Sequence, residues 1–242
     1  MTTVLKLGGS VITQKAEPET VDEAALETAA AALADREDLV VVHGGGSFGH
    51  HHADRHGVTT RQGIHDPAAI SDIHVAMTRL NATVIEVLAD AGVPALPVHP
   101  LSVAHRDAHG TLTFPIGQVR TMLSERFVPV LHGDGIVHTD EGATVLSGDE
   151  IVVHIAETLD ADRIGVCSAE PGVYDDAGDV IDTITDIEEV EAALGDSEAT
   201  DVSGGMAGKV RELLSLDPPA HVFDLAGLEV FLADGAPGTR ID

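Results

Sequence analysis

Short aliphatic runs alternate with amphipathic segments along almost the whole chain of 242 residues. This alternation is typical of a parallel sheet whose strands are joined by crossover helices. The predicted strands cover residues 3–7, 39–43, 94–98, 127–133, 163–167, 221–225 and 228–232. The predicted helices cover residues 22–35, 67–92, 116–125, 148–159 and 186–194, and a last helix ends near residue 216. We therefore predict an α/β fold built on one continuous, mainly parallel sheet, whose two halves divide near residue 140.

Several helix boundaries carry signals of their own. Thr20 and Glu23 have the spacing of a capping box before the first long helix. Asp66 is expected to cap the helix that begins at Pro67, and Gly92 is expected to end it. A hairpin is expected around the HGTLTF stretch, where apolar and polar residues alternate.

The charge of the chain excludes some classes of partner. There are 41 Asp and Glu residues against 13 Lys and Arg residues, a formal charge of −28. Such a surface repels nucleic acid and anionic membranes, so neither is expected as a partner. The acidic residues are scattered along a chain that is 43% hydrophobic, which favours adaptation to molar salt over an acidic, disordered interaction protein.

The core and the location follow from the remaining composition. Aromatic residues make up only 2% of the chain, so the core must be aliphatic. No apolar run approaches the roughly 18 residues that span a bilayer, and MTTVLKLGGS does not have the pattern of a signal peptide. Cys167 is the single cysteine; it excludes an intramolecular disulfide and is expected to be a buried core residue. We therefore expect a cytoplasmic protein.

Lysine is rare in this sequence and its positions are informative. The three lysines are Lys6, Lys15 and Lys209, and all lie in or beside the glycine-rich segments LKLGGSVITQK and SGGMAGK. A compact ammonium group with three donors suits a phosphate oxygen. The retention of lysine at these places points to phosphate chemistry.

Glycine turns follow three of the predicted strands, at residues 7–10, 43–50 and 132–135. The carboxyl ends of parallel strands form the edge at which α/β sheets bind ligands. Glycine lets the backbone come close to a phosphate, and consecutive N–H groups form an anion site. Three such turns at one edge, together with SGGMAGK, predict a phosphate-binding cleft.

Two nucleotide motifs are present only in part. Gly44, Gly46 and Gly49 have the G-x-G-x-x-G spacing of a dinucleotide fingerprint, which requires a helix directly afterwards and an acidic residue about 20 residues on. The sequence HHHADRHG follows instead and is predicted to be turn-like, which disfavours a nicotinamide or flavin cofactor. SGGMAGK is not a Walker A motif, because one residue is missing and Val210 replaces the Ser or Thr that would hold magnesium.

Histidines and carboxylates supply further candidates. A protein-bound metal is not expected at the histidine cluster, since adjacent histidines on a turn rarely converge on one ion. His50 ends the second glycine turn and could donate to a phosphate, whereas the others are expected to be solvated or bonded locally. Asp149 begins a helix, where it could complement the helix dipole or orient lysines and a Mg²⁺ complex, and Asp201 is similarly ambiguous. The other cluster members are His51, His52 and His56.

The long helix predicted from residue 67 has an apolar face. Its apolar residues recur at helical spacing and are expected to be core, although some could line an apolar substrate slot next to the second glycine turn. These residues are Ile73, Met77, Leu80, Val84 and Leu88.

These motifs resemble the isopentenyl phosphate kinase branch of the amino acid kinase family. The segments that carry the resemblance are LKLGGSVIT with Lys15, HGGGSFGH, VLHGDG, LSGDEIVVHIAETLDADRI, PGVY, DVSGGMAGKV and PGTRI. The SFGH ending is what narrows the resemblance to this branch. The resemblance implies a three-layer αβα sandwich and a homodimer. It also implies a kinase that transfers the γ-phosphoryl group of ATP to isopentenyl phosphate, a step in isoprenoid precursor synthesis.

The resemblance also implies a division of roles within one kinase domain. Residues 1–140 would form the acceptor-binding lobe, and residues 141–242 would bind ATP with Mg²⁺ held through the nucleotide. Lys15 would stabilise the transition state, with Asp149 organising the centre. The acceptor phosphate would be held by Gly45, Gly49 and His50. The ATP phosphates would be held by Lys6, Gly8, Gly9, Ser10, Gly46, Gly205 and Lys209. Two stretches depart from the family pattern, HHADRHG after SFGH and SAEPGVY.

An acceptor phosphate is already an anionic nucleophile, so this chemistry requires positioning and charge neutralisation but no general base. Other acceptors remain open, namely a carboxylate, a carbamate, a nucleoside monophosphate or a phosphonate. A non-catalytic nucleotide-binding protein on the same fold would bind ATP without turnover.

Overall fold

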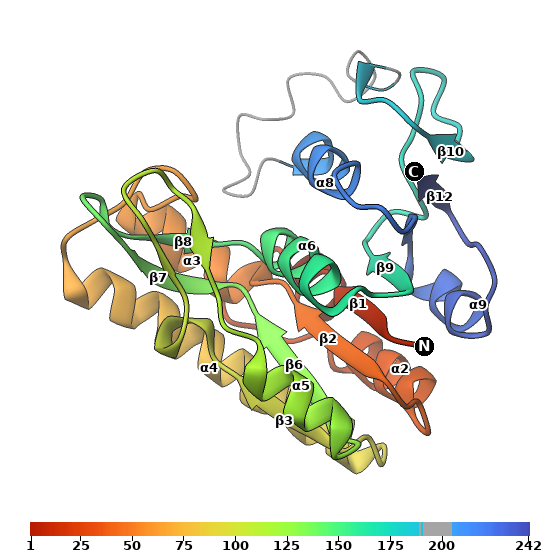
Figure 1. Ribbon diagram of the computed structural model, residues 1–242, viewed down its shortest axis with the longest axis horizontal. Helices are drawn as coiled ribbons and strands as arrows, with labels where there is room; N and C mark the ends of the chain where they lie inside the picture. The colour runs from red at the N-terminus through yellow and green to blue at the C-terminus, as the bar shows by residue number, and fades with distance from the viewer. Residues whose placement is uncertain (189, 191–204) are drawn as a thin grey trace.

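A computed structural model describes residues 1–188, 190 and 205–242 (Figure 1). Its main sheet has the strand order β10-β12-β11-β9-β1-β2-β6-β3. The neighbours in this sheet pair in parallel, except for the antiparallel pair of β11 and β12. Its strands are β1 (Thr3–Leu7), β2 (Leu39–His43), β3 (Ala95–Val98), β6 (Val128–His132), β9 (Arg163–Cys167), β10 (Thr183–Ile184), β11 (Ala220–Phe223) and β12 (Thr239–Ile241). The predicted parallel α/β sheet is confirmed.

Helices cover both faces of this sheet and complete the three-layer αβα sandwich (Figure 1). One face packs against α1 (Gly9–Ile12), α2 (Glu23–Leu33), α3 (Gly46–His56), α4 (Pro67–Asp90) and α9 (Leu228–Leu232). The other face packs against α5 (Gly117–Ser124), α6 (Gly148–Leu159) and α8 (Gly205–Leu213). Successive side chains of a strand point to opposite faces of the sheet. In β2, Val40 and Val42 pack on one face and Val41 packs on the other. Both cores are mainly aliphatic, as the composition predicts, with four buried phenylalanines among the aliphatic side chains.

A second sheet was predicted only in part, as the hairpin around HGTLTF, which the structure confirms. Its order is β5-β4-β7-β8, with strands β4 (His105–Arg106), β5 (Leu112–Thr113), β7 (Asp134–His138) and β8 (Gly142–Leu146). The expectation of one continuous sheet was therefore wrong. Gly133 ends the turn after β6, and Asp134 already begins β7, which pairs with β8 in antiparallel register. The tight connection between β7 and β8 uses positive φ angles at Asp140 (71°) and Gly142 (81°).

Local predictions at helix ends had mixed outcomes. The long helix begins at Pro67 with Asp66 as its cap, and Gly92 adopts a φ of +85° just beyond its end, as predicted. The capping box at Thr20 was wrong, because the side chain of Asp22 accepts the hydrogen bond from Ala25 N. An aspartate directly before the helix caps the amide of Ala25, two residues beyond the amide of Glu23 that the threonine was expected to cap.

Two segments have a different secondary structure from the predicted one. The first seven residues of HHHADRHG lie in the helix α3, which begins at Gly46 inside the second glycine turn, and Gly57 is its C-cap. One of the two grounds against a dinucleotide fingerprint therefore fails. The second ground, the lack of an acidic residue at the end of a following strand, stands. The chain continues into α4, and the next strand begins only at Ala95. Residues 228–232 form α9 and not a strand, since Leu228 and Phe231 pack into the core from one helical face. The helix predicted at 186–194 lies largely outside the described residues, as does Asp201.

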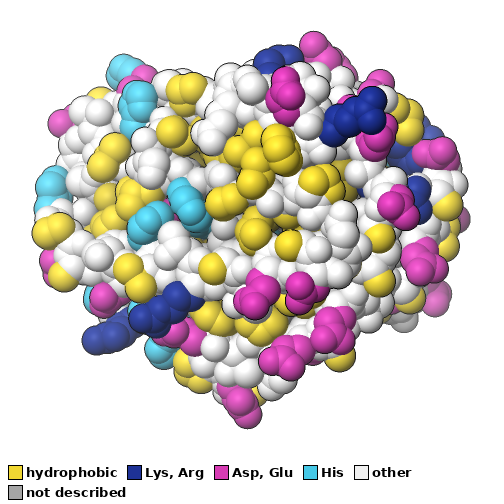
Figure 2. Space-filling model, turned by 90° about the horizontal axis from the view of Figure 1, so that it is seen from below, with side chains coloured by type: hydrophobic (Ala, Val, Ile, Leu, Met, Phe, Trp, Pro, Cys, Tyr) yellow, Lys and Arg dark blue, Asp and Glu magenta, His cyan; other side chains and the backbone are white. Residues whose placement is uncertain are grey.

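The charged surface is mixed. On the face shown in Figure 2, acidic side chains are scattered among hydrophobic and polar ones and do not form one continuous field. Among the residues that the structure describes, no helix is both long enough and apolar enough to cross a membrane.

The three predicted glycine turns meet at one edge of the main sheet. β1, β2 and β6 are neighbours in parallel register, with Leu7 beside His43 and His43 beside His132. Each of these strands ends at the same level and leads into a glycine. This register is what places the three turns side by side.

Candidate active site

A cleft of about 640 Å³ lies at this edge of the sheet. It is lined by all the candidate residues of the sequence analysis within the described chain except Gly205. These are Lys6, Gly8, Gly9, Ser10, Lys15, Gly45, Gly46, Gly49, His50, Asp149 and Lys209. Gly205 begins α8, one helical turn before Lys209. The fold therefore brings together residues that lie up to two hundred positions apart in the sequence.

The first two glycine turns pack backbone against backbone. A Cβ on Gly9 would lie 2.1 Å from the amide nitrogen of Gly46, and one on Gly44 would lie 2.6 Å from the nitrogen of Gly9. Gly46 also has a φ of +46°, with Thr13 Oγ1 2.0 Å from where its Cβ would be. Thr13 Oγ1 accepts the hydrogen bond from Ser47 N. Any side chain here would force the turns apart and displace the amides that face the cleft.

Lys6 and Asp149 form a buried ion pair in the floor of the cleft. Lys6 Nζ lies 2.5 Å from Asp149 Oδ2, and their side chains are only 7% and 8% exposed. Lys209 Nζ approaches the same oxygen at 3.8 Å. Burial lowers the pKa of Lys6, and Asp149 opposes this effect. Burial alone would raise the pKa of Asp149, but the two lysines outweigh it and lower this pKa to about 2.

The start of α6 holds Asp149 in place. Ser147 Oγ accepts from Glu150 N, and the Glu150 carboxylate accepts from Ser147 N, so both halves of a capping box are formed. Arg106 of β4 donates to the other oxygen of Glu150 at 2.5 Å, which ties the second sheet to this helix start. Asp149 Oδ1 is buried and has no hydrogen-bond partner within the described chain. That oxygen is available to a ligand.

Lys15 and His50 are exposed and line the open side of the cleft. Lys15 lies in a loop that Glu19 fastens to α3, since Glu19 N donates to Ser47 O. His50 lies in α3, close enough to Asp149 to contribute to lowering the pKa of that carboxyl. Neither side chain has a hydrogen bond or ion pair in the described part of the chain, so both are free to meet a substrate.

The cleft also has an apolar wall. Ile73 and Met77 of α4 line it together with Ala53 of α3, and all three are buried in the core behind it. The sulfur of Met77 lies 2.8 Å from where a Cβ on Gly49 would be, so the glycine lets α3 lie directly against α4. Part of the apolar face predicted on the long helix is therefore shared between core and cleft.

A buried histidine network behind the glycine turns was not foreseen. His43 Nδ1 donates to Gly44 O at 3.1 Å, so its Nε2 accepts from the amide of Asn81 at 3.1 Å. His132 Nδ1 donates to Gly133 O at 2.9 Å, and its Nε2 accepts from His99 Nδ1 at 2.9 Å. With the proton of each ring on Nδ1, every one of these contacts pairs one donor with one acceptor, and all three rings are neutral. The sequence signal was a histidine directly before each of these glycines.

The His43 contact also orients the second glycine turn. Because the peptide between Gly44 and Gly45 is planar and trans, its N–H points opposite to its carbonyl. The carbonyl of Gly44 is bonded to the imidazole of His43. The amide of Gly45, which lines the cleft, therefore points away from that ring.

The buried histidines predict that stability falls in mild acid. Burial lowers the pKa of His43 to about 4 and that of His132 to about 3, from 6.5. Both are neutral in the folded state, so between pH 6.5 and 4 the unfolded chain binds more protons. The free energy of unfolding should fall by about 1.4 kcal/mol per pH unit for each histidine over this range. Urea denaturation in molar KCl at several pH values measures this slope.

The matched variant for this measurement is His132→Gln, which removes one of the two fully buried histidines. Its slope between pH 6 and 4.5 should be smaller than that of the unchanged protein by about 1.4 kcal/mol per pH unit, because His43 and the partly buried His99 and His221, whose pKa values burial also lowers, contribute in both proteins. Partly exposed His74 works in the opposite direction, because its hydrogen bond to Asp134 raises its pKa. Equal slopes in the two proteins would contradict the assignment of neutral, buried rings.

Glu212 of α8 was also missed, since nothing in the sequence marks it. Burial, together with the negative charges of Asp149 and Glu150, raises its pKa to about 8. Its carboxyl is therefore protonated near neutral pH. In that form it adds no further negative charge beside Lys6 and Lys209.

The described geometry agrees with what is known of similar proteins. The profile of the Amino acid kinase family matches residues 1–216. This chain belongs to the amino acid kinase family. An isopentenyl phosphate kinase from Haloferax volcanii is 57% identical over 241 residues, which are 98% of this chain and 97% of the relative. An isopentenyl phosphate kinase from Methanothermobacter thermautotrophicus is 34% identical over 88% of this chain and 86% of its own length.

A solved structure extends this similarity to the fold. The X-ray structure of an isopentenyl phosphate kinase superposes on all of this amino acid kinase family member with a TM-score of 0.87 at 28% identity, and the match covers 100% of both chains. The predicted resemblance and the predicted αβα architecture are confirmed. The relative from Haloferax volcanii also fits the salt adaptation expected from the acidic composition.

Proposed function

We propose that this chain is an ATP-dependent kinase that transfers the γ-phosphoryl group of ATP to isopentenyl phosphate, giving isopentenyl diphosphate and ADP. The observation that carries the proposal is the cleft itself. It gathers all three lysines of the chain beside three glycine turns, and two of them, Lys6 and Lys209, pair there with the buried Asp149. Relatives that match over nearly the whole chain are named for this activity.

On the nucleotide side, Lys6 and Lys209 would neutralise the phosphates of ATP. Asp149 pairs with both ammonium groups, because its Oδ2 lies 2.5 Å from Lys6 Nζ and 3.8 Å from Lys209 Nζ. Mg²⁺, when bound to the nucleotide, would reduce the charge of the phosphates further. The residues fit such an ion, since the unpartnered Oδ1 of Asp149 is the hard oxygen ligand that Mg²⁺ prefers.

On the acceptor side, the amides of Gly45 and Gly49 and the imidazole of His50 would hold the phosphate of the acceptor. The apolar wall of Ile73 and Met77 would receive its hydrocarbon part. The acceptor phosphate attacks as an anion, so the chain supplies position and charge and does not have to remove a proton. Lys15, on the open side between the two substrates, would stabilise the charge that develops on the transferring group.

The remaining expectations stay proposals. Residues 1–140 would form the acceptor lobe and residues 141–242 the ATP lobe of one kinase domain. Gly8, Gly9, Ser10, Gly46 and Gly205 would present backbone amides to the nucleotide phosphates. We also propose a homodimer located in the cytoplasm.

The direct test offers several acceptors to one preparation. The protein would be assayed for ADP release with Mg²⁺-ATP in molar KCl, with isopentenyl phosphate, glutamate, UMP, carbamate or a phosphonate as acceptor. Turnover is expected with isopentenyl phosphate alone, with isopentenyl diphosphate as the product. In His50→Ala the kcat/KM for isopentenyl phosphate should fall by 10²-fold or more, while ATP binding is unchanged.

Other outcomes of this assay separate the alternatives. ATP binding without turnover on any acceptor would favour a non-catalytic nucleotide-binding protein. Turnover on a carboxylate, with His50→Ala as active as the unchanged protein, would remove the acceptor assignment and keep the kinase. The exposed neighbour His51 supplies a matched control, since His51→Ala removes an imidazole from the same helix.

A further inference from the structure

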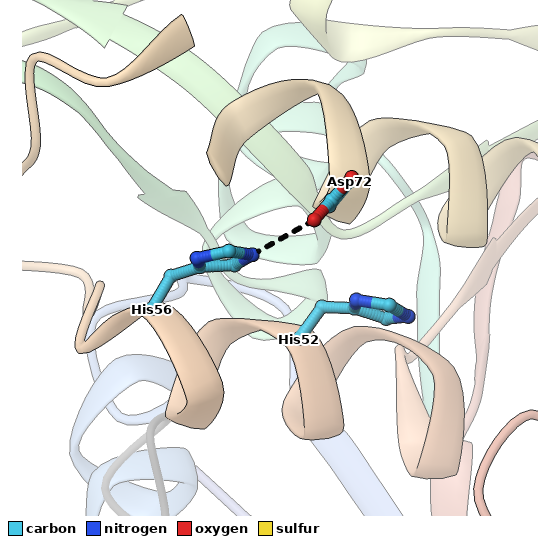
Figure 3. Close-up of side chains that lie close together, drawn as sticks. All are labelled: His52, His56 and Asp72. Atoms are coloured by element: carbon cyan, nitrogen blue, oxygen red, sulfur yellow. Dashed lines mark hydrogen bonds and ion pairs between the residues drawn. The ribbon is translucent and has the colours of Figure 1, made fainter. Parts of the chain in front are cut away.

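A cluster of potential metal ligands lies between α3 and α4 (Figure 3). His52 and His56 are one helical turn apart on α3, so both project from the same face. Asp72 projects toward them from α4. One donor atom from each of the three side chains lies within 4.8 Å of the other two. The sequence predicts a turn here and, on that ground, no metal; the helix removes that reason.

The hydrogen bonds leave one nitrogen of His52 without a partner. His52 Nε2 lies 2.8 Å from Glu19 Oε1, and a carboxylate can only accept, so Nε2 carries the proton. The lone pair of the neutral ring is therefore on Nδ1. That nitrogen is buried and has no hydrogen-bond partner in the described residues. A buried lone pair without a partner costs free energy unless a ligand meets it.

The same arrangement is typical of metal-binding histidines. Such histidines commonly donate their second N–H to a carboxylate, which fixes the tautomer and makes the free nitrogen a better ligand. Glu19 has this position relative to His52. His56 Nε2 donates to Asp72 Oδ2 at 3.0 Å, so an ion that bound here would displace this proton and meet an imidazole nitrogen and a carboxylate oxygen that are already adjacent.

We propose that His52, His56 and Asp72 bind a divalent transition-metal ion such as Zn²⁺, with Glu19 as the carboxylate behind His52. Two imidazoles and one carboxylate are a common protein ligand set for Zn²⁺, and water completes the tetrahedron. Bonds of about 2.0–2.1 Å to zinc require ligand atoms about 3.3 Å apart. The present separations of up to 4.8 Å would close by side-chain rotation, which the 46% exposure of the Asp72 side chain permits.

The proposed metal site is connected to the cleft through Glu19. Glu19 follows the loop of Lys15 and also pairs with Arg79 of α4 at 3.3 Å. An ion at this site would therefore join α3, α4 and the Lys15 loop through one cluster. The site itself lies outside the residues that line the cleft, so ion binding can be measured independently of the proposed kinase activity.

The test uses the full chain without a polyhistidine tag, freed of metal by dialysis against a chelator. Isothermal titration with Zn²⁺ is expected to show one saturable site per chain. Replacement of a ligand, in His56→Ala or Asp72→Asn, should weaken this site by at least tenfold. Glu19→Gln should weaken it by about 10- to 100-fold, because that residue acts through His52. Titration with Co²⁺ should give the visible absorption of a tetrahedral site, which Zn²⁺ then abolishes.

The control is His109→Ala, which removes an exposed histidine from the β4–β5 hairpin outside the cluster. Its affinity for Zn²⁺ should equal that of the unchanged protein. Circular dichroism establishes that each variant is folded, and His52→Gln serves as a second ligand variant. Absence of a saturable site, or equal affinity in His56→Ala, would overturn the proposal and leave the cluster as two local hydrogen-bonded pairs.

Discussion

Lys15→Ala is expected to lower kcat by about 10²- to 10³-fold while the free energy of unfolding changes by less than about 0.5 kcal/mol. The first effect follows from the role proposed for Lys15, an exposed lysine that lines the cleft and would neutralise the charge that develops on the transferring phosphoryl group. The second follows because its side chain is exposed and makes no hydrogen bond or ion pair within the described residues. Steady-state kinetics with Mg²⁺-ATP and isopentenyl phosphate, with urea denaturation, measures both.

Two variants separate charge from position. Lys15→Arg keeps the positive charge but changes the geometry of the donors, so it should recover only part of the activity. Arg55→Ala removes an exposed cation from α3 that does not line the cleft, and it should retain the full kcat. A Lys15→Ala protein as active as the unchanged one would refute the role of Lys15. An equal loss of kcat in Arg55→Ala would instead indicate that the overall electrostatic potential of the protein, and not Lys15 in particular, is responsible.

Asp149→Asn is expected to damage stability and activity together. The substitution leaves Lys6 buried beside a neutral amide, and breaking a buried ion pair in this way costs about 3 kcal/mol. The low pKa of Asp149, about 2, shows that its charge stabilises the folded state above about pH 4 and that this contribution is lost as the pH falls toward 2. kcat should fall by at least 10²-fold, because the two lysines lose the carboxylate that holds them.

The pH profile of this variant supplies a sharper measurement. Burial lowers the pKa of Lys6 and Asp149 raises it again, so removal of Asp149 should lower the pKa of Lys6 further. The alkaline limb of kcat against pH should then move to lower pH in Asp149→Asn. Asp54→Asn is the matched control, since Asp54 also lines the cleft but is exposed, and it should alter neither stability nor the limb. An unmoved alkaline limb in Asp149→Asn would contradict the coupling.

Most of the site residues predicted from the sequence line the cleft, and the reason is physical. Glycines at the ends of aliphatic strands need no knowledge of the fold to be placed, since parallel strands put all their carboxyl ends at one edge. The rarity of lysine in this acidic chain then marked Lys6, Lys15 and Lys209. Their shared cleft is what the structure adds.

Contacts between distant segments could not be predicted in this way. The histidine network depends on His43, His132 and His99 coming from three different strand ends and on Asn81 from a helix. The high pKa of Glu212 depends on the approach of α8 to the start of α6. No local pattern encodes either contact, because each is created by packing.

The sequence by itself determined the alternation of strands and helices, the edge of the sheet at which the cleft lies and the residue types that line it. These properties depend on periodicity, on the backbone freedom of glycine and on the chemistry of lysine, all of which are local. Only the tertiary structure decided that β7 and β8 form a second sheet, that HHHADRHG is helical and that Asp149 lies between Lys6 and Lys209. Those outcomes depend on burial and on long-range distance, which a single sequence does not contain.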